Sequence, residues 1–213
     1  GGSISGLGTV RYVGCNTATY SVNLPSPAAF PALSILAGDS TAGCDLAGFG
    51  ASQVPSFVAT ANITVSSTLV FYTADGGAAG DFDLDLSASN FSLTVTGATT
   101  VGQASGNDAV INLRASTVTF TGNITLNTSA AFITTGAATV TASGTYTNSS
   151  TNATDWNVTA GTWTFNGSTA TMTFAGTNLA ENEFNNLTFN SATTGSAQTF
   201  TMATQGLRLG GTL

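Results

Sequence analysis

The chain of 213 residues contains no histidine and no lysine, and its only cationic side chains are Arg11, Arg114 and Arg208. Without histidine, Ser-His-Asp and Cys-His catalysis and the usual His-ligated metal sites are excluded. Three arginines against ten acidic residues give a net charge of −7, so the chain cannot neutralise a run of phosphates and we expect no nucleic acid partner. Charged residues make up only 6% of the chain, against about 25% in ordinary globular domains. Neutral side chains therefore fill the polar positions, and serine and threonine together number 61.

Long apolar runs, cysteine and proline are also scarce. No uninterrupted apolar run approaches the roughly 18 residues of a membrane-spanning helix, so we expect no membrane span. Both cysteines, Cys15 and Cys44, lie in the first quarter of the chain. A disulfide between them suits an exported protein and would stabilise it by about 3–4 kcal/mol, with two buried free thiols as the alternative.

Residues 1–60 differ in composition from the rest, because they contain all four prolines and both cysteines. We therefore divide the chain into an irregular, disulfide-containing N-terminal segment, residues 1–60, and a repetitive unit, residues 61–213. The glycine-rich stretch 3–10 has the character of a strand that pairs with a neighbouring subunit. The segment is expected to hold short strands over 9–13 and 19–22, an irregular loop over 24–31 and one or two helical turns over 32–37.

From residue 61 onward, apolar residues recur in pairs two positions apart. This alternation predicts short, half-buried strands, and the pairs follow one another too closely for helical crossovers. The sequence divides into units of about 19–35 residues, as in solenoids with corners of variable length. We therefore predict an all-β parallel β-solenoid, with a β-sandwich or jelly roll using donor-strand exchange as the alternative. The pairs include Ile63/Val65, Leu84/Leu86, Leu93/Val95, Ile111/Leu113, Val118/Phe120, Ile124/Leu126, Trp163/Phe165, Met172/Phe174 and Leu187/Phe189.

Three stretches, 161–176, 183–190 and 199–213, resemble the Gly-Thr-, Asn-Gly-Ser-Thr- and Asn-Leu-Thr-containing units of large repetitive surface proteins of bacteria and archaea. The similarity is close over about 155–213, loose over 62–154 and absent over 1–60. It implies a right-handed parallel β-helix at the cell surface, and its motifs carry no catalytic residues. The sequence also stops at Leu213 in the middle of a unit, so we expect either that the chain continues or that another copy covers this end, as in a filament.

Nine Asn-x-Ser/Thr motifs are present, which is more than chance would give. On an exported protein several would be expected to carry N-linked glycans. The alternative is that asparagine and threonine simply alternate on the surface of a β-sheet. The acceptor asparagines are Asn62, Asn90, Asn123, Asn127, Asn148, Asn152, Asn157, Asn166 and Asn186.

Acidic residues gather at one place, where Asp75, Asp81, Asp83 and Asp85 fall within eleven residues. In a strand, the last three carboxylates would share one face with about 7 Å between neighbours. Such a group suits calcium, which prefers several oxygen ligands. A solvated strand face and the carboxylate pair of a glycoside hydrolase are the alternatives.

The sequence as a whole favours an extracellular structural protein over an enzyme. We expect a self-assembling subunit of a surface filament, sheath or S-layer-like coat, with copies of itself as partners, covalently attached glycans and no cofactor other than the candidate calcium. Two alternatives stay open. One is a stalk fragment of a large adhesin, and the other is a carbohydrate-active β-helix enzyme that uses the aspartate cluster. We expect Trp156 and Trp163 to pack in the core rather than bind sugar.

Overall fold

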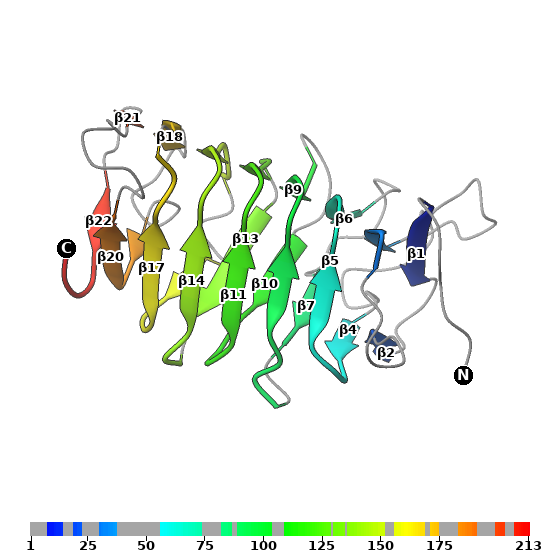
Figure 1. The fold of residues 1–213 in the computed structure, drawn as a ribbon. Helices are drawn as coiled ribbons and strands as arrows, with labels where there is room; N and C mark the ends of the chain where they lie inside the picture. Colours follow the sequence, from blue (N-terminus) through cyan, green and yellow to red (C-terminus); the bar gives the residue numbers. More distant parts are fainter. Residues whose placement is uncertain are drawn as a thin grey trace.

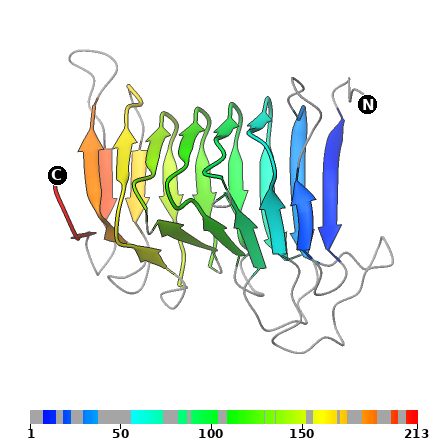
Figure 2. The ribbon, with the colours of Figure 1, turned by 90° about the horizontal axis from the view of Figure 1, so that it is seen from below.

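The computed structural model is an elongated stack of short strands, with the two chain ends at opposite ends of the stack (Figures 1 and 2). None of the described residues is helical. The structure describes residues 8–14, 19–22, 30–37, 56–73, 82–86, 89–103, 109–128, 130–134, 136–151, 156–168, 171–174, 183–190, 199–202 and 207–213.

The strands form three main sheets, which we call A, B and C, and a fourth sheet of two strands. Sheet A consists of β1 (Thr9–Gly14), β3 (Ala32–Ala37), β6 (Leu69–Thr73), β9 (Thr99–Val101), β12 (Ile124–Leu126), β15 (Tyr146–Asn148), β18 (Thr171–Phe174) and β21 (Thr199–Met202). Sheet B consists of β2 (Thr19–Val22), β4 (Ser56–Ala59), β7 (Phe82–Asp85), β10 (Ala109–Asn112), β13 (Ala130–Thr134) and β16 (Asn157–Val158). Sheet C consists of β5 (Ile63–Val65), β8 (Leu93–Val95), β11 (Thr117–Phe120), β14 (Thr139–Ala142), β17 (Thr162–Phe165) and β20 (Asn186–Phe189). The pair β19 (Glu183–Phe184) and β22 (Arg208–Leu209) forms the small sheet.

The chain visits the sheets in the order A, B, C, so each circuit is one turn of a parallel β-solenoid. Five successive turns, from β3–β4–β5 to β15–β16–β17, contribute one strand to each main sheet. Every strand pairing is parallel, and each strand lies beside its counterpart in the neighbouring turns. Ile124 pairs with Tyr146, 22 residues later, whereas Ile63 pairs with Leu93, 30 residues later. Corner segments of different length therefore absorb the irregularity of the sequence, while the strands keep their register.

The core fills the space inside the three sheets, because every second residue of a strand points inward. In sheet C the first inward position of each turn is aliphatic or aromatic, and all six of these residues are buried. Threonine occupies the outward position between the inward ones, where its β-branched side chain suits an extended backbone. The six buried residues are Ile63, Leu93, Val118, Val140, Trp163 and Leu187.

Three glycines stack at the corner where the chain passes from sheet C to sheet A. A Cβ atom added to Gly97, Gly122 or Gly144 would overlap a backbone carbonyl group of the turn below. For Gly122 this group belongs to Gly97, and for Gly144 it belongs to Gly122. None of the three has φ in the left-handed region, so close approach of successive turns, and not an unusual backbone conformation, requires glycine here.

These observations confirm the predicted all-β parallel solenoid, and the uniformly parallel pairing excludes the β-sandwich. They also confirm strands over 9–13 and 19–22, as β1 and β2. The helical turn expected over 32–37 was wrong, because this segment is β3. Five of its six side chains are buried, so the apolar run reflects a nearly fully buried strand between β1 and β6 and not a helix. The strands that precede residue 61 belong to the same sheets A and B as those that follow it.

Candidate functional site

The aspartates singled out in the sequence are only partly within the described residues. Asp83 and Asp85 lie in β7 of sheet B, where the Cα of Asp85 pairs with that of Asn112 in the next turn. Leu84 and Leu86 are buried and Asp85 is half-buried, which agrees with an outward carboxylate. Asp75 and Asp81 lie outside the described residues. Among the residues that the structure describes, no group of three potential metal ligands is found. The calcium site stays a prediction.

The candidate disulfide, Cys15 to Cys44, also lies outside the described residues. Arg114 is exposed, at a corner where its φ is +45°. Trp156 and Trp163 are 5% and 1% exposed, which supports the core role over sugar binding.

The nine glycosylation motifs fall into distinct environments. Asn62, Asn90, Asn123 and Asn157 are exposed. Asn148 is fully buried, and its Oδ1 accepts a hydrogen bond from the backbone N–H of Ser150, so a glycan cannot be accommodated there in the folded chain. The Nδ2 of Asn127, which would carry the glycan, donates to the carbonyl oxygen of Gly102 at 2.9 Å. Asn166 and Asn186 are half-buried, and Asn152 lies outside the described residues.

Three of these asparagines share a corner motif that the sequence did not reveal. The Oδ1 of Asn62, Asn123 and Asn186 accepts a hydrogen bond of 2.9–3.0 Å from the backbone N–H one turn later, at Ser92, Thr145 and Thr212 respectively. In each case the residue after the asparagine donates its own N–H to the carbonyl oxygen of that same later residue. The local sequence is Asn-Ile-Thr or Asn-Leu-Thr, with the asparagine at the corner, the aliphatic residue inward and the threonine on the strand. The motif gives three of the nine acceptor asparagines a structural role, and these hydrogen bonds use Oδ1 and not the attachment atom Nδ2.

The outward side of sheet C is the most uniform surface of the described structure, and we call its two central columns the threonine face. The strands of this sheet run side by side in nearly parallel directions, with no other described strand in front of them (Figure 1). One column contains threonine in all six turns: Thr64, Thr94, Thr119, Thr141, Thr164 and Thr188. The adjacent column lies two residues earlier along the chain in each turn, at the start of the strand or just before it. It contains Asn62, Ser92, Thr117, Thr139, Thr162 and Asn186.

The threonine face carries no ionisable side chain, and none of its twelve residues is buried. Its central part, from β11 to β17, has threonine in both columns on three successive turns. The apolar pairs predicted the strands, but the threonines between them could not be aligned from the sequence because the corners differ in length. The trace of the threonine face in the sequence is a recurring pattern of a polar residue, an apolar residue and a threonine.

The outward sides of the other two sheets are less uniform. In sheet A the corresponding column passes through Ser34 and Val70 before a run of five threonines begins at Thr100. In sheet B it passes through Val58, Asp85 and Asn112. The three sides of the solenoid therefore differ in chemistry, although the backbone is built the same way on each.

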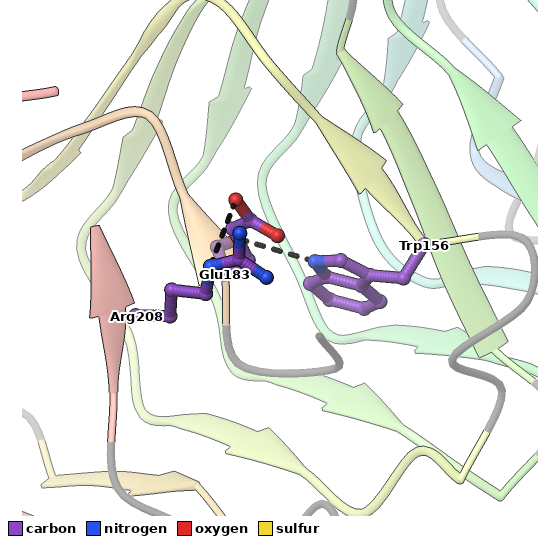
Figure 3. A network of polar contacts seen from close by, with 3 residues as sticks. All are labelled: Trp156, Glu183 and Arg208. Carbon is purple, nitrogen blue, oxygen red and sulfur yellow. Dashed lines mark hydrogen bonds and ion pairs between the residues drawn. The ribbon is translucent and has the colours of Figure 1, made fainter. Parts of the chain in front are cut away.

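Side chains also connect successive turns near the C-terminal end (Figure 3). The indole Nε1 of Trp156, just before β16, donates to the backbone carbonyl oxygen of Glu183 in β19 at 3.1 Å. The carboxylate of Glu183 lies 3.5 Å from Nε of Arg208 in β22. Arg208 is more than half exposed, so this ion pair stabilises the fold only slightly. These contacts connect three successive turns, so we assign them to the fold and not to a binding site.

One buried polar group stands out in the core. The phenol oxygen of Tyr146 is fully buried and has no hydrogen-bond partner in the described structure. Burial raises the pKa of this phenol far above its ordinary value. Aromatic rings surround it, with ring centroids 5.3–6.3 Å away at Trp163, Phe165, Phe174 and Phe184. This enclosure offers no route for a substrate, so we assign Tyr146 to the core.

Comparison with known proteins gives no relative for this chain: no family model, curated protein or solved structure matches it. Among the described residues no helix has the length and apolar character needed to cross a membrane.

Proposed function

We propose that this chain is an extracellular structural protein, a self-assembling subunit of a surface filament, sheath or coat. The observation that carries the proposal is the contact between turns. The five complete turns, from β3–β4–β5 to β15–β16–β17, bind one another through in-register parallel strands in all three sheets. A further turn can be added with the same geometry whether it comes from the same chain or from another copy, and head-to-tail addition of copies gives an open fibre.

The surface chemistry supports the same function. Charged residues are rare, and threonine, serine and asparagine occupy the outward strand positions of sheet C. A neutral hydroxyl-rich surface stays hydrated without the long-range repulsion between like charges that opposes dense packing of subunits. The scarcity of lysine and arginine also leaves few cleavage sites for trypsin-like proteases, which suits a protein exposed outside the cell.

The test is negative-stain electron microscopy of native material, together with intact mass measured on the same sample. Ordered fibres or sheets, with a mass above the 21.2 kDa of the polypeptide, are expected for a glycosylated assembly subunit. Dispersed particles at the polypeptide mass would overturn the proposal. They would favour the adhesin stalk, and loss of polysaccharide cleavage on Asp83→Asn would favour the enzyme.

Glycosylation is the second part of the proposal, and the exposure of each acceptor asparagine guides our choice of sites. The exposed acceptors Asn62, Asn90, Asn123 and Asn157 are the proposed attachment points, and the buried Asn148 is not. Glycopeptide mapping of the native protein should find sugar on at least one of the four and none on Asn148. At Asn123 the variant Thr125→Val removes the acceptor sequence and keeps the asparagine, so it separates loss of the glycan from loss of the corner hydrogen bond.

A further inference from the structure

We infer that the threonine face of sheet C binds ice, that is, a crystalline lattice of water molecules. The inference rests on the regular placement and the chemistry of this surface, and it is independent of assembly into a filament. Ice binding is measured on the dispersed chain and assembly on native material, so failure of one leaves the other standing.

The first argument is geometric. Neighbouring strands of a sheet lie about 4.8 Å apart, and outward residues two positions apart along a strand are separated by about 6.6–6.8 Å. Because the register of sheet C is unbroken from β5 to β20, these spacings repeat in two dimensions across the face. The spacing between strands is close to the repeat of oxygen atoms along the a axis of hexagonal ice, and the spacing along a strand is somewhat shorter than the repeat along the c axis. An array of hydroxyl groups with this spacing meets many lattice positions at once, and many weak contacts then act together.

The second argument concerns the side chain. A threonine hydroxyl donates one hydrogen bond and accepts others, as a water molecule in ice does. The β-branched side chain is stiff at χ1, so hydroxyl and methyl groups hold their positions before ice is met, and little rotamer entropy is lost on binding. On the three turns with Thr117, Thr139 and Thr162 in the adjacent column, both outward positions have these properties.

The third argument is the absence of features that other partners need. The twelve residues of the threonine face include no charge, no aromatic ring and no large apolar side chain. Protein interfaces are anchored by buried aromatic, arginine or apolar residues, and nucleic acids require cations. A charged side chain would also retain its own hydration shell against incorporation into a lattice. A neutral, uniform array of hydroxyl groups suits an uncharged, periodic partner.

The test uses the complete 213-residue chain and two substitutions in matched positions. Thr141→Tyr places a ring at the centre of the threonine face. Thr147→Tyr places the same ring on the outward side of sheet A, on the strand that follows along the chain. Both proteins are compared with the wild type by inhibition of ice recrystallisation and by thermal hysteresis in a nanolitre osmometer. Far-UV circular dichroism and the midpoint of thermal unfolding establish that each variant is folded.

The wild type should inhibit recrystallisation and shape growing ice crystals. Thr141→Tyr should lose about tenfold in potency, because the ring keeps neighbouring threonines from reaching the lattice together. Thr147→Tyr should retain the activity of the wild type. If Thr141→Tyr does not fold, Thr164→Tyr in the next turn of the same column replaces it. A further pair, Thr141→Val and Thr141→Ser, separates the methyl group from the hydroxyl group.

Three results would overturn the inference. The first is a folded wild type without effect on ice in either assay. The second is equal loss of activity in Thr141→Tyr and Thr147→Tyr, because the threonine face would then have no special role. The third is concentration-dependent association of the wild type in sedimentation experiments that Thr141→Tyr abolishes, because a second copy would then be the partner of this face.

Discussion

The central turns of the solenoid, residues 93–142, and the C-terminal turns, residues 146–189, build the same backbone stack around different cores. In the central turns, stacked glycines bring successive corners into close contact, and most inward residues are aliphatic. In the C-terminal turns the core is a cluster of aromatic rings around Tyr146, which includes Trp163 and Phe165. The turn that joins Ile124 to Tyr146 takes 22 residues, and the one that joins Tyr146 to Met172 takes 26.

This difference shows which features of a solenoid are fixed and which are free. Backbone pairing fixes the register, because parallel strands in neighbouring turns stay aligned in both regions. Core volume is free within limits, because equivalent inward positions hold an aliphatic side chain in one region, such as Val140, and an aromatic ring in the other, such as Trp163. The two regions should therefore respond differently to changes in the core and at the corners, and alike to changes in the asparagine motif.

The largest effect is expected from removing the biggest side chain of the aromatic core. Trp163→Ala should lower the free energy of unfolding by about 4 kcal/mol, because it removes buried apolar surface and leaves a cavity. Val140 pairs with Trp163 one turn earlier, so Val140→Ala is the matched change in the central turns and should lose about half as much. Urea unfolding followed by circular dichroism measures both. Equal losses would show that the two cores contribute alike to the free energy of unfolding, and the proposed difference between the two regions would be wrong.

The next effect concerns the stacked glycines of the central turns. Gly122→Ala should lower the free energy of unfolding by about 3 kcal/mol, because the new Cβ overlaps the backbone carbonyl group of Gly97 and neither turn can move without breaking strand pairs. Gly8→Ala is the control, since a Cβ there meets no atom within 4 Å. Urea unfolding measures the stability of both variants. A Gly122→Ala protein as stable as the control would show that the corner has room to relax.

The sequence predicted the strands of both regions better than it predicted their surfaces. Apolar alternation located pairs such as Leu93/Val95 and Trp163/Phe165, and these residues are buried as expected. It could not show that Thr94 and Thr164 belong to one column, because the column depends on counting residues through corners of different length. The threonine face is therefore a property of the register, which only the folded backbone reveals.

Two further features were hidden for different reasons. The segment 32–37 is almost fully buried, so it lacks the alternation that identifies a half-exposed strand and its composition resembles a helix. The hydrogen bonds of the corner asparagines were hidden because the corner motif and the glycan acceptor sequence share the order of asparagine, any residue, threonine. The same sequence pattern is compatible with a glycan acceptor and with a corner hydrogen bond. Only the folded structure reveals the hydrogen bond.

A smaller effect, equal in both regions, is expected from the asparagine motif. Asn123→Ala and Asn186→Ala should each lower the free energy of unfolding by about 1 kcal/mol, because each leaves a backbone N–H without its side-chain acceptor. Asn123→Asp keeps an acceptor oxygen and should recover most of the loss. Urea unfolding measures the three variants side by side. A loss at only one of the two asparagines would mean that the corners, and not only the cores, differ between the regions.

The smallest effect at neutral pH concerns the hydroxyl at the centre of the aromatic cluster. Tyr146→Phe removes a buried oxygen without a partner, so it should leave stability unchanged or raise it by about 1 kcal/mol.

The difference between the two proteins should then grow in alkali. Burial raises the pKa of the Tyr146 phenol, so the folded chain keeps this proton at a pH where the unfolded chain, with an ordinary pKa near 10, has lost it. Above about pH 10 this phenol therefore lowers the free energy of unfolding of the wild type, by up to about 1.4 kcal/mol for each further pH unit. The phenylalanine variant lacks this contribution. Urea unfolding of both proteins between about pH 8 and 11 measures it, and the remaining tyrosines cancel because both chains contain them. Parallel stability curves across this range would mean that the Tyr146 hydroxyl reaches solvent, and the aromatic core would then be more open than the aliphatic one.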